Sequence, residues 1–349
     1  MRNDTRILFS AYVSQIALLS GVASAFTQFT VAPAVEQKLE EIISHSHEFL
    51  QRIQTVPVTQ QIGDKVGVGV TRPLAGRTNT AAGNRRTPTD PTDTSDLGQY
   101  VCKQTNFDHA IKYAKIDAWR HRPEFQTIIR DVIAKQQGRD RIMIGWNGTS
   151  AAVQTDRVAN PLLQDVNEGW IYKIRTHAPA RVLDDGDLSG AGKAIYVAMG
   201  EVGVEVDYTN LDALVFDGVE LLDEWNRDDT DLVVIVGRDL VHDKYFSIIN
   251  EAGNTASEME ARDRILSSTK QIGGLPAVRV PFFPANALMI TRLDNLSIYV
   301  QEGTRRRQVK DEPALDQIEN YESVNEAYVV EDYGRVAFIE NIVMGKKPG

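Results

Sequence analysis

The chain has 349 residues, 42% of them hydrophobic and 25% charged, which is enough for two domains and a sizeable core. Its formal net charge of −10 excludes a general nucleic-acid coat, because such a protein needs a basic surface to neutralise phosphates. Cys102 is the single cysteine, so no intrachain disulfide can form. A reducing compartment and a packing role for this thiol are expected.

The first 29 residues are predicted to form an amphipathic helical arm. Its polar face carries Arg6, Ser10 and Ser14, and its apolar face carries Phe9, Val13, Ile16 and Ala17. The alternative is a signal peptide, because Ala23–Ala25 has the Ala-x-Ala pattern. Asp4 and the polar residues within the apolar run oppose it. No later run is long and apolar enough to span a membrane.

A second helix is predicted over residues 36–52, and two strand-like runs follow it. Valines alternate with glycines over residues 66–70, and residues 107–113 alternate in the same way, so these runs could be the stems of one long hairpin.

The segment between them, residues 71–98, has almost no hydrophobic pattern. It carries Arg72, Arg77, Arg85 and Arg86 before any acidic residue appears. Loops beyond about 12–15 residues are uncommon inside compact domains. The segment is therefore either a solvated loop or an arm that lies on another surface, and the strand-like flanks favour the arm.

Apolar residues recur at helical spacing over residues 123–144 and predict a rod about 33 Å long. A further helix is expected from the Asn160–Pro161 cap to Ile174. Residues 183–207 look hairpin-like, and Thr209 with Asp212 suggests a capping box. The helix that this box opens is expected to bury Leu211, Leu214, Val215, Leu222 and Trp225.

A strand, Gly237 and a helix are predicted over residues 231–246, and short strands over residues 275–300. The chain is expected to end in two or three strands with a turn at Tyr333–Gly334.

Motifs that could carry chemistry are weak throughout. Gly237 stands alone after its strand, with Asp239 where a phosphate would lie, so nucleotide binding is not expected. "DLSGAGKA" (187–194) lacks the first glycine and the closing Ser/Thr of a phosphate loop, and "DDGD" (184–187) lacks the spaced ligands of a calcium loop. The sequence therefore predicts no catalytic residue, no cofactor and no metal site, as is typical of a structural protein.

Longer stretches resemble the major capsid proteins of peduovirus-type (P2-like) tailed phages. They run in the family's order over most of the chain, and they include "FTVAPAVEQKLEEIISHSHEFL", "NFDHAIKYAKIDAW", "NPLLQDVNEGWIYKIRTHAPARV", "DLVVIVGRDLVHDKYFSIIN" and "NYESVNEAYVVEDYG". Residues 71–98 and 183–207 diverge, so loop contacts cannot be transferred there.

The resemblance implies an α+β fold of the Hong Kong 97 type. Its parts are expected to be an N-terminal arm (1–52), an extended hairpin loop (53–115), a peripheral domain with a long spine helix (116–158 and 291–349) and an axial domain (159–290). It also implies a phage protease that removes residues 1–29, a candidate propeptide and scaffold-interacting segment, at Phe29–Thr30.

The implied function is self-assembly into pentamers and hexamers of an icosahedral head around double-stranded DNA. Further partners would be an internal scaffold or protease and a portal protein, with no membrane, and the chain would be in the virion after assembly in the host cytoplasm. The alternatives are an encapsulin-like cellular compartment and a two-domain α/β enzyme. Contacts between subunits are expected from Arg72, Arg77, Arg85 and Arg86 to acidic residues of a neighbour, with Glu322, Glu326, Glu331 and Asp332 as candidates.

Overall fold

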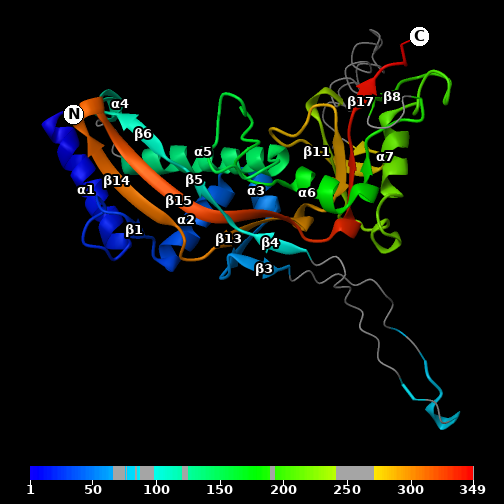
Figure 1. Ribbon diagram of the computed structural model, residues 1–349, viewed down its shortest axis with the longest axis horizontal. Helices are drawn as coiled ribbons and strands as arrows, with labels where there is room; N and C mark the ends of the chain where they lie inside the picture. The colour runs from blue at the N-terminus through cyan, green and yellow to red at the C-terminus, as the bar shows by residue number, and fades with distance from the viewer. Residues whose placement is uncertain are drawn as a thin grey trace, which may run out of the picture.

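A computed structural model describes residues 1–65, 75, 77–82, 85–86, 98–119, 125–188, 193–240 and 271–348. Figure 1 shows an elongated α+β molecule with two units, each built around one large sheet, and the described residues 77–82 lie away from both. The helices are α1 (Asn3–Leu19), α2 (Pro33–His45), α3 (Glu48–Arg52), α4 (Tyr113–Trp119), α5 (Phe125–Asn147), α6 (Trp170–His177) and α7 (Leu211–Val219).

The first unit is a seven-stranded sheet whose centre is the 14-residue strand β15. Both β13 and β14 pair antiparallel with β15, one after the other along its length, and β5 and β6 also pair with it. At the edges, β2 adds parallel to β13 and β1 adds antiparallel to β14. The strands are β1 (Phe29–Thr30), β2 (Gln54–Val58), β5 (Lys103–Asn106), β6 (His109–Lys112), β13 (Leu296–Gln301), β14 (Arg306–Glu312) and β15 (Gln317–Val330).

The second unit is a six-stranded sheet in the order β10-β11-β9-β12-β16-β7. Alternate residues of β9 face two different cores: Val233 and Ile235 pack with the helices α5 and α6, whereas Val234 and Val236 pack with α7. Both faces of β9 are therefore buried, which explains its uninterrupted apolar run. The strands are β7 (Val182–Leu183), β9 (Val233–Val236), β10 (Gln271–Ile272), β11 (Leu275–Val278), β12 (Leu288–Thr291) and β16 (Val336–Ile339), and β8 (Ile195–Val197) pairs with β17 (Ile342–Met344) beside it.

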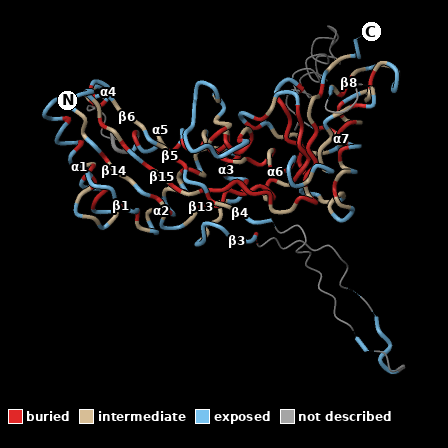
Figure 2. Tube along the Cα trace, viewed as in Figure 1, coloured by how far each residue is buried: buried red, intermediate tan, exposed pale blue. Residues whose placement is uncertain are grey.

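The long helix predicted over residues 123–144 is confirmed as α5. Its C-terminal half packs in a cluster of aromatic rings, where Trp146 and Trp170 lie 4.9 Å apart between centroids and Phe49 and Tyr328 contact Trp170. Figure 2 shows buried residues concentrated where this cluster joins β13, β15 and the second sheet.

Three predicted elements differ in the structure. The helix over 36–52 is divided into α2 and α3, because the Ser46 hydroxyl bonds to the carbonyl of Ile43 and ends the first helix. The helix expected from Asn160 begins only at Trp170, since Leu163 has a φ of 58°, which no right-handed helix allows. The cap of α7 is Asn210, whose side chain accepts from the Ala213 N–H, and not Thr209.

The hairpin and domain boundaries also change. Of residues 107–113, which were predicted as a strand, only 109–112 are one (β6), and they pair with β15 rather than with residues 66–70, which lie outside the described residues. The described stems are β3 (Ile62–Asp64) and β4 (Gln99–Val101), which pair with each other. The turn at Tyr333–Gly334 is confirmed as the 3-10 helix η6 (Tyr333–Arg335), after which β16 joins the second sheet. Residues 336–339 therefore pair within the six-stranded sheet and residues 342–344 pair with β8, whereas residues 291–349 were expected to form one domain with residues 116–158.

Candidate assembly surfaces

The extended loop is fixed at its root and free of the body at its tip. At the root, Lys65 donates to the backbone carbonyl of Val330 (2.8 Å), and its ammonium lies 4.3 Å from the centre of the Tyr333 ring. Figure 1 shows the described tip, with the 3-10 helix η1 (Thr80–Ala82), far from both sheets. A segment held this way exposes its backbone and side chains to whatever lies beside the subunit.

Three of the four predicted contact arginines are described. Arg77, Arg85 and Arg86 are all exposed on this tip, and Arg72 lies outside the described residues. The structure thus places three exposed arginines on the described tip, which Figure 1 draws away from both sheets.

A set of six charged side chains lies inside the first unit, and we call it the buried charge cluster. It consists of Glu36 and Glu40 of α2, Arg141 of α5, Arg305 just before β14, and Glu322 and Glu326 of β15. Arg141 contacts Glu40 (Nη1–Oε2, 2.6 Å) and Glu326 (Nε–Oε2, 3.0 Å), and Arg305 pairs with Glu40 and Glu322. These pairs join α2, α5 and the central strand β15.

The cluster corrects two of the predicted subunit contacts. Glu322 and Glu326 are 4% and 0% exposed, and both are paired with arginines of their own chain. They therefore cannot meet the arginines of a neighbour's loop. Their burial could have been predicted, because β15 alternates and these glutamates share the face of Ile318 and Val324.

The pKa values within the cluster diverge. Burial acts to raise the pKa of Glu40, but Arg141 and Arg305 outweigh it and lower the pKa to about 2. Burial raises the pKa of Glu36 above its usual value, because a hydrogen bond from the Gly303 N–H and the more distant Arg305 offset it only in part. The pKa of Glu326 is likewise raised by burial, against the charge of Arg141. The pKa values of carboxyls in one cluster are thus shifted in opposite directions.

The other two acidic candidates lie at the surface beside the root of the loop. Glu331 accepts from the Tyr299 hydroxyl (3.0 Å), and Asp332 caps η6 by accepting from the Gly334 N–H (2.7 Å). Asp332 also lies 3.2 Å from Arg335. Both are half-buried, so they keep some access to solvent.

The junction Phe29–Thr30 forms the edge strand β1. Phe29 is opposite Arg307 and Thr30 is opposite Arg306 in the ladder with β14. The Phe29 side chain is buried, and that of Thr30 is exposed. Residues on the N-terminal side are docked on the body: the predicted apolar face of α1 is confirmed, since Phe9, Val13, Ile16 and Ala17 are its buried hydrophobic residues.

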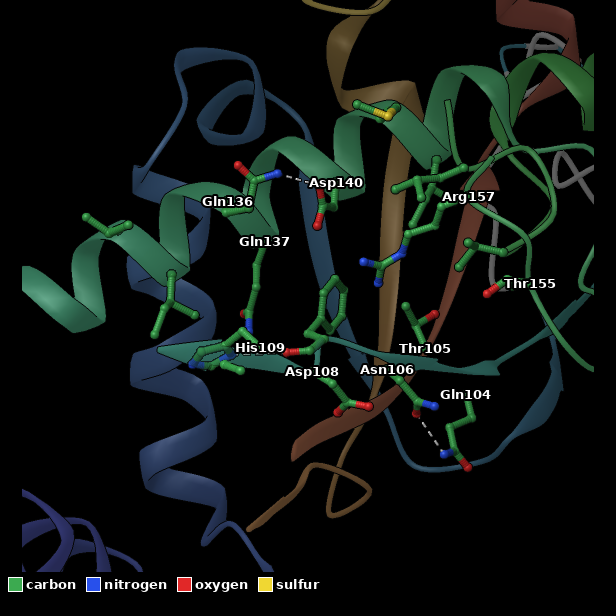
Figure 3. Close-up of a pocket in the computed structure, with 18 of the residues that line it drawn as sticks. Gln104, Thr105, Asn106, Asp108, His109, Gln136, Gln137, Asp140, Thr155 and Arg157 are labelled. Atoms are coloured by element: carbon green, nitrogen blue, oxygen red, sulfur yellow. Dashed lines mark hydrogen bonds between the residues drawn. The ribbon is translucent and has the colours of Figure 1, made fainter. Parts of the chain in front are cut away.

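A cavity of about 690 Å³ lies between β5–β6, α5 and the loop of residues 152–166 (Figure 3). Its polar lining is rich in amides, with Gln136 donating to Asp140 (2.7 Å) and Gln104 donating to Asn106 (3.0 Å). Asp108 holds the break between β5 and β6 by accepting from the Glu322 N–H (3.0 Å). These polar groups serve the local fold, and among the hydrogen bonds of the described lining none pairs a nucleophile with a base.

The weak motifs have structural explanations. A Cβ on Gly237 would overlap with the backbone of residues 284–285, so this glycine allows a close approach of two chain segments rather than of a phosphate. Cys102 is fully buried, which raises the pKa of its thiol to about 11. Within the described ranges, His, Cys, Asp and Glu do not gather in threes as metal ligands. None of the helices in the described part of the chain combines the length and apolar character that a membrane span requires.

Exposed apolar side chains on the second unit were not predicted. Met199, Phe216 and Trp225 are 80%, 73% and 57% exposed. Trp225 was expected to be buried, but it lies on the short 3-10 helix η3 (Glu224–Asn226) at the surface. Large exposed apolar residues of this kind often mark surfaces for protein contact. Helical spacing alone cannot show which end of an apolar run remains outside the core.

The comparisons with known proteins match this chain along nearly all of its length. The family model "Phage major capsid protein, P2 family" matches residues 8–342. The chain belongs to this family. The "Capsid proteins" of Escherichia phage P2 are 46% identical over 349 residues, covering 99% of this chain and 96% of the relative. The "Major capsid protein" of Serratia phage KSP20 is 40% identical over 350 residues, covering 99% of each chain.

A solved structure agrees with the family. It is titled "Satellite phage P4 procapsid including size determination (Sid) protein", and it matches with a TM-score of 0.80 and 44% identity over 99% of both chains. This chain is therefore a major capsid protein of a P2-like phage, and proteins of this family assemble into oligomeric shells that form the capsid of the virion. The family consists of structural proteins, so the enzyme alternative is wrong, and the phage head is favoured over the cellular compartment.

Proposed function

We propose that this chain builds the pentamers and hexamers of an icosahedral head of the Hong Kong 97 type, which encloses double-stranded DNA. The observation that carries the proposal is the tip of the extended loop, whose described residues are exposed and lie away from the two sheets (Figure 2). A segment of this kind gains fixed contacts only on another molecule. In a shell made of identical subunits, that molecule is a further copy, joined head to tail.

Contacts between copies combine charge with apolar burial. Arg77, Arg85 and Arg86 of one subunit meet acidic groups of its neighbour, with Glu331 and Asp332 as the remaining candidates. Each exposed ion pair contributes only about 0–1 kcal/mol. Apolar surfaces such as Phe216 and Trp225, repeated around every ring, therefore supply most of the stability.

Maturation removes residues 1–29 by cleavage at Phe29–Thr30, carried out by a protease inside the assembling shell. Proteases bind extended backbone, which β1 supplies, but the pairing of β1 with β14 and the buried Phe29 protect the bond. Cleavage thus follows a local separation of β1 from the sheet. Before cleavage, the exposed side of α1 contacts the internal scaffold, for which it offers the apolar residues Ile7, Leu8, Leu18 and Leu19.

Packaged DNA is held weakly and without sequence preference. The net charge of −10 opposes tight phosphate binding, so DNA can enter and later leave the shell. A portal protein supplies the route of entry at one vertex. Assembly takes place in the host cytoplasm.

One experiment tests the assembly and its maturation together. The chain is expressed with its scaffold and protease, and the products are examined by negative-stain imaging and intact mass measurement. Hollow uniform shells and a mass lacking residues 1–29 are expected. Open sheets or lone subunits would contradict the proposed shell assembly. A full-length mass in mature shells would contradict the proposed cleavage.

A loop variant tests the contact itself. Replacing Arg77, Arg85 and Arg86 with Glu is expected to abolish shells, while the matched replacement with Lys retains them, because the charge is kept. The two variants should unfold at the same urea concentration as the parent, since these side chains are exposed. If the Glu and Lys variants assembled equally well, the loop would not be part of the proposed interface.

A further inference from the structure

Residues 1–29 cover a continuous apolar face of the first unit. In Figure 1 the segment lies at the end of the molecule beside β14 and α4. The buried apolar residues of the segment are Phe9, Val13, Ile16, Ala17, Ala25 and Phe29. They pack against the body residues Val31, Tyr113, Ile116, Ile129, Val309 and Ile318. The body therefore presents a face that is complementary to the segment.

Polar contacts hold the helical part of the segment in one position. The Arg2 N–H donates to Asp117 (3.1 Å), and Arg6 Nη1 lies 3.3 Å from Asp311 Oδ2. These contacts fix the N-terminal half of α1 on α4 and β14. None of them involves the peptide bond at residue 29.

The extended part of the segment is held through backbone groups. Val309 N–H donates to the Ala25 carbonyl (2.9 Å), Gln308 Nε2 donates to the Phe26 carbonyl (2.9 Å), and Phe29 continues this pairing opposite Arg307. The segment thus reads as a helix followed by a strand that adds to a sheet edge. Both are established ways for a protein to bind a peptide.

We propose that the body of this protein is a peptide-binding site that retains residues 1–29 after the Phe29–Thr30 bond is hydrolysed. The ligand class is an amphipathic helix followed by a short extended strand. Water cleaves the bond to give a carboxylate on Phe29 and an ammonium on Thr30, and the new carboxylate lies beside Arg307 in the ladder. The biological setting rests on the proposed maturation cleavage.

If this site retains the segment, loss of residues 1–29 takes two steps, cleavage and then release, rather than one. Hydrolysis breaks the covalent link, but the segment leaves only when its helix and strand dissociate from the body. Its departure uncovers Ile116, Ile129, Val309 and Ile318 and frees the edge of β14. Release, rather than cutting, is then the event that changes the surface of the subunit.

An engineered cut in the full chain tests the site without relying on natural maturation. The recognition sequence of a site-specific protease is inserted between Phe29 and Thr30, and the purified subunit is cut and examined by native mass spectrometry at micromolar concentration. The 1–29 fragment is expected to remain bound and to separate in urea. A fragment that separates as soon as the bond is cut would overturn the proposal.

Variant peptides identify the face that holds the fragment, and the body stays unchanged. A labelled 1–29 peptide is exchanged into the cut subunit, either as the parent sequence or with Val13→Asp or Ser14→Asp. Val13 is 4% exposed and Ser14 is its exposed neighbour on the same helix. Val13→Asp is expected to weaken binding at least tenfold, and Ser14→Asp less than twofold.

Equal binding of all three peptides would show that the apolar face does not hold the fragment, and the site would be rejected. The proposed maturation is judged separately, from the mass of the subunit in mature shells. A subunit that keeps residues 1–29 there rejects the cleavage but leaves the engineered exchange unaffected.

Discussion

Arg141 Nη1 of α5 lies 2.6 Å from Glu40 Oε2 of α2, and this buried pair connects the two helices. Arg141 also contacts Glu326 of β15, so one guanidinium joins three elements that are far apart in sequence. Such a pair is costly to break, because a remaining carboxylate is buried without its counter-ion.

Arg141→Met should therefore destabilise the subunit by about 3–5 kcal/mol, because Glu326 loses the arginine that pairs with it in a site closed to water, whereas Glu40 keeps Arg305. The matched control is Arg139→Met, an exposed position on the same helix, where a change below about 0.5 kcal/mol is expected. Urea unfolding of isolated subunits measures both. Similar losses in the two variants would mean that the buried pair has no special role.

The two glutamates of α2 should respond to pH in opposite directions. The folded pKa of Glu40 is about 2, against 4.5 as its usual value, so Glu40 stabilises the fold above pH 4.5, and this contribution is lost as the pH falls toward 2. The folded pKa of Glu36 is raised, so its contribution is present below pH 4.5 and is lost as the pH rises through that folded value.

Glu40→Gln should therefore cost about 3 kcal/mol at pH 7 and progressively less as the pH falls from 5 to 2. Glu36→Gln serves as the partner variant and should be neutral or stabilising at pH 7, because a neutral amide avoids the cost of burying a charge. Unfolding free energies at several pH values give the comparison. A Glu40→Gln deficit that does not change with pH would contradict the assigned ionisation.

Local patterns predicted the elements better than the contacts between them. The apolar spacing of α5 and the buried face of α1 were both evident, because helix periodicity extends over several turns. The alternation in β15 also predicted that Glu322 and Glu326 are buried, because they lie on the same face of the strand as Ile318 and Val324. The arginines that pair with these glutamates could not be predicted from the local sequence, because Arg141 is 185 residues away from Glu326 in the chain.

Irregular segments were the least predictable part of the fold. Residues 160–169 have apolar residues at helical spacing, yet the Asp165 carboxylate accepts from the Asp156 N–H (2.7 Å) and holds the segment as a loop. Side chains that bond to nearby backbone compete with helix formation in this way. For residues 71–98, the lack of an apolar pattern left a solvated loop and an arm on another surface as alternatives, and the arm remains a prediction.

Gly145 of α5 should not tolerate alanine, although alanine normally favours a helix by about 1 kcal/mol. A Cβ at this position would overlap with the ring of Trp170, which is fixed by the hydrogen bond from its Nε1 to the Ser297 carbonyl (3.1 Å). Gly145→Ala is expected to cost about 1–3 kcal/mol. Gln136→Ala, on the exposed side of α5, should be neutral or stabilising.

A second substitution at the partner ring tests this explanation. Trp170→Leu removes the ring that the new methyl group meets, so adding Gly145→Ala should cost less in that background than in the parent. Thermal unfolding of the four proteins completes the cycle. Additive losses would show that the ring is not what excludes alanine.

Cys102 should be inert in the folded subunit. Burial raises the pKa of its thiol to about 11, and the reactive thiolate is therefore scarce at pH 8. An aromatic disulfide reagent is expected to react with it only in urea, whereas a Ser150→Cys thiol, introduced at an exposed position, reacts at once.

Because Cys102 joins β4 to β5 and its N–H donates to the Gln61 carbonyl (2.8 Å), its exposure requires the root of the extended loop to open. Slower reaction in assembled shells than in free subunits would mean that a neighbour holds this root closed, and fast reaction in both would show that the root opens without unfolding.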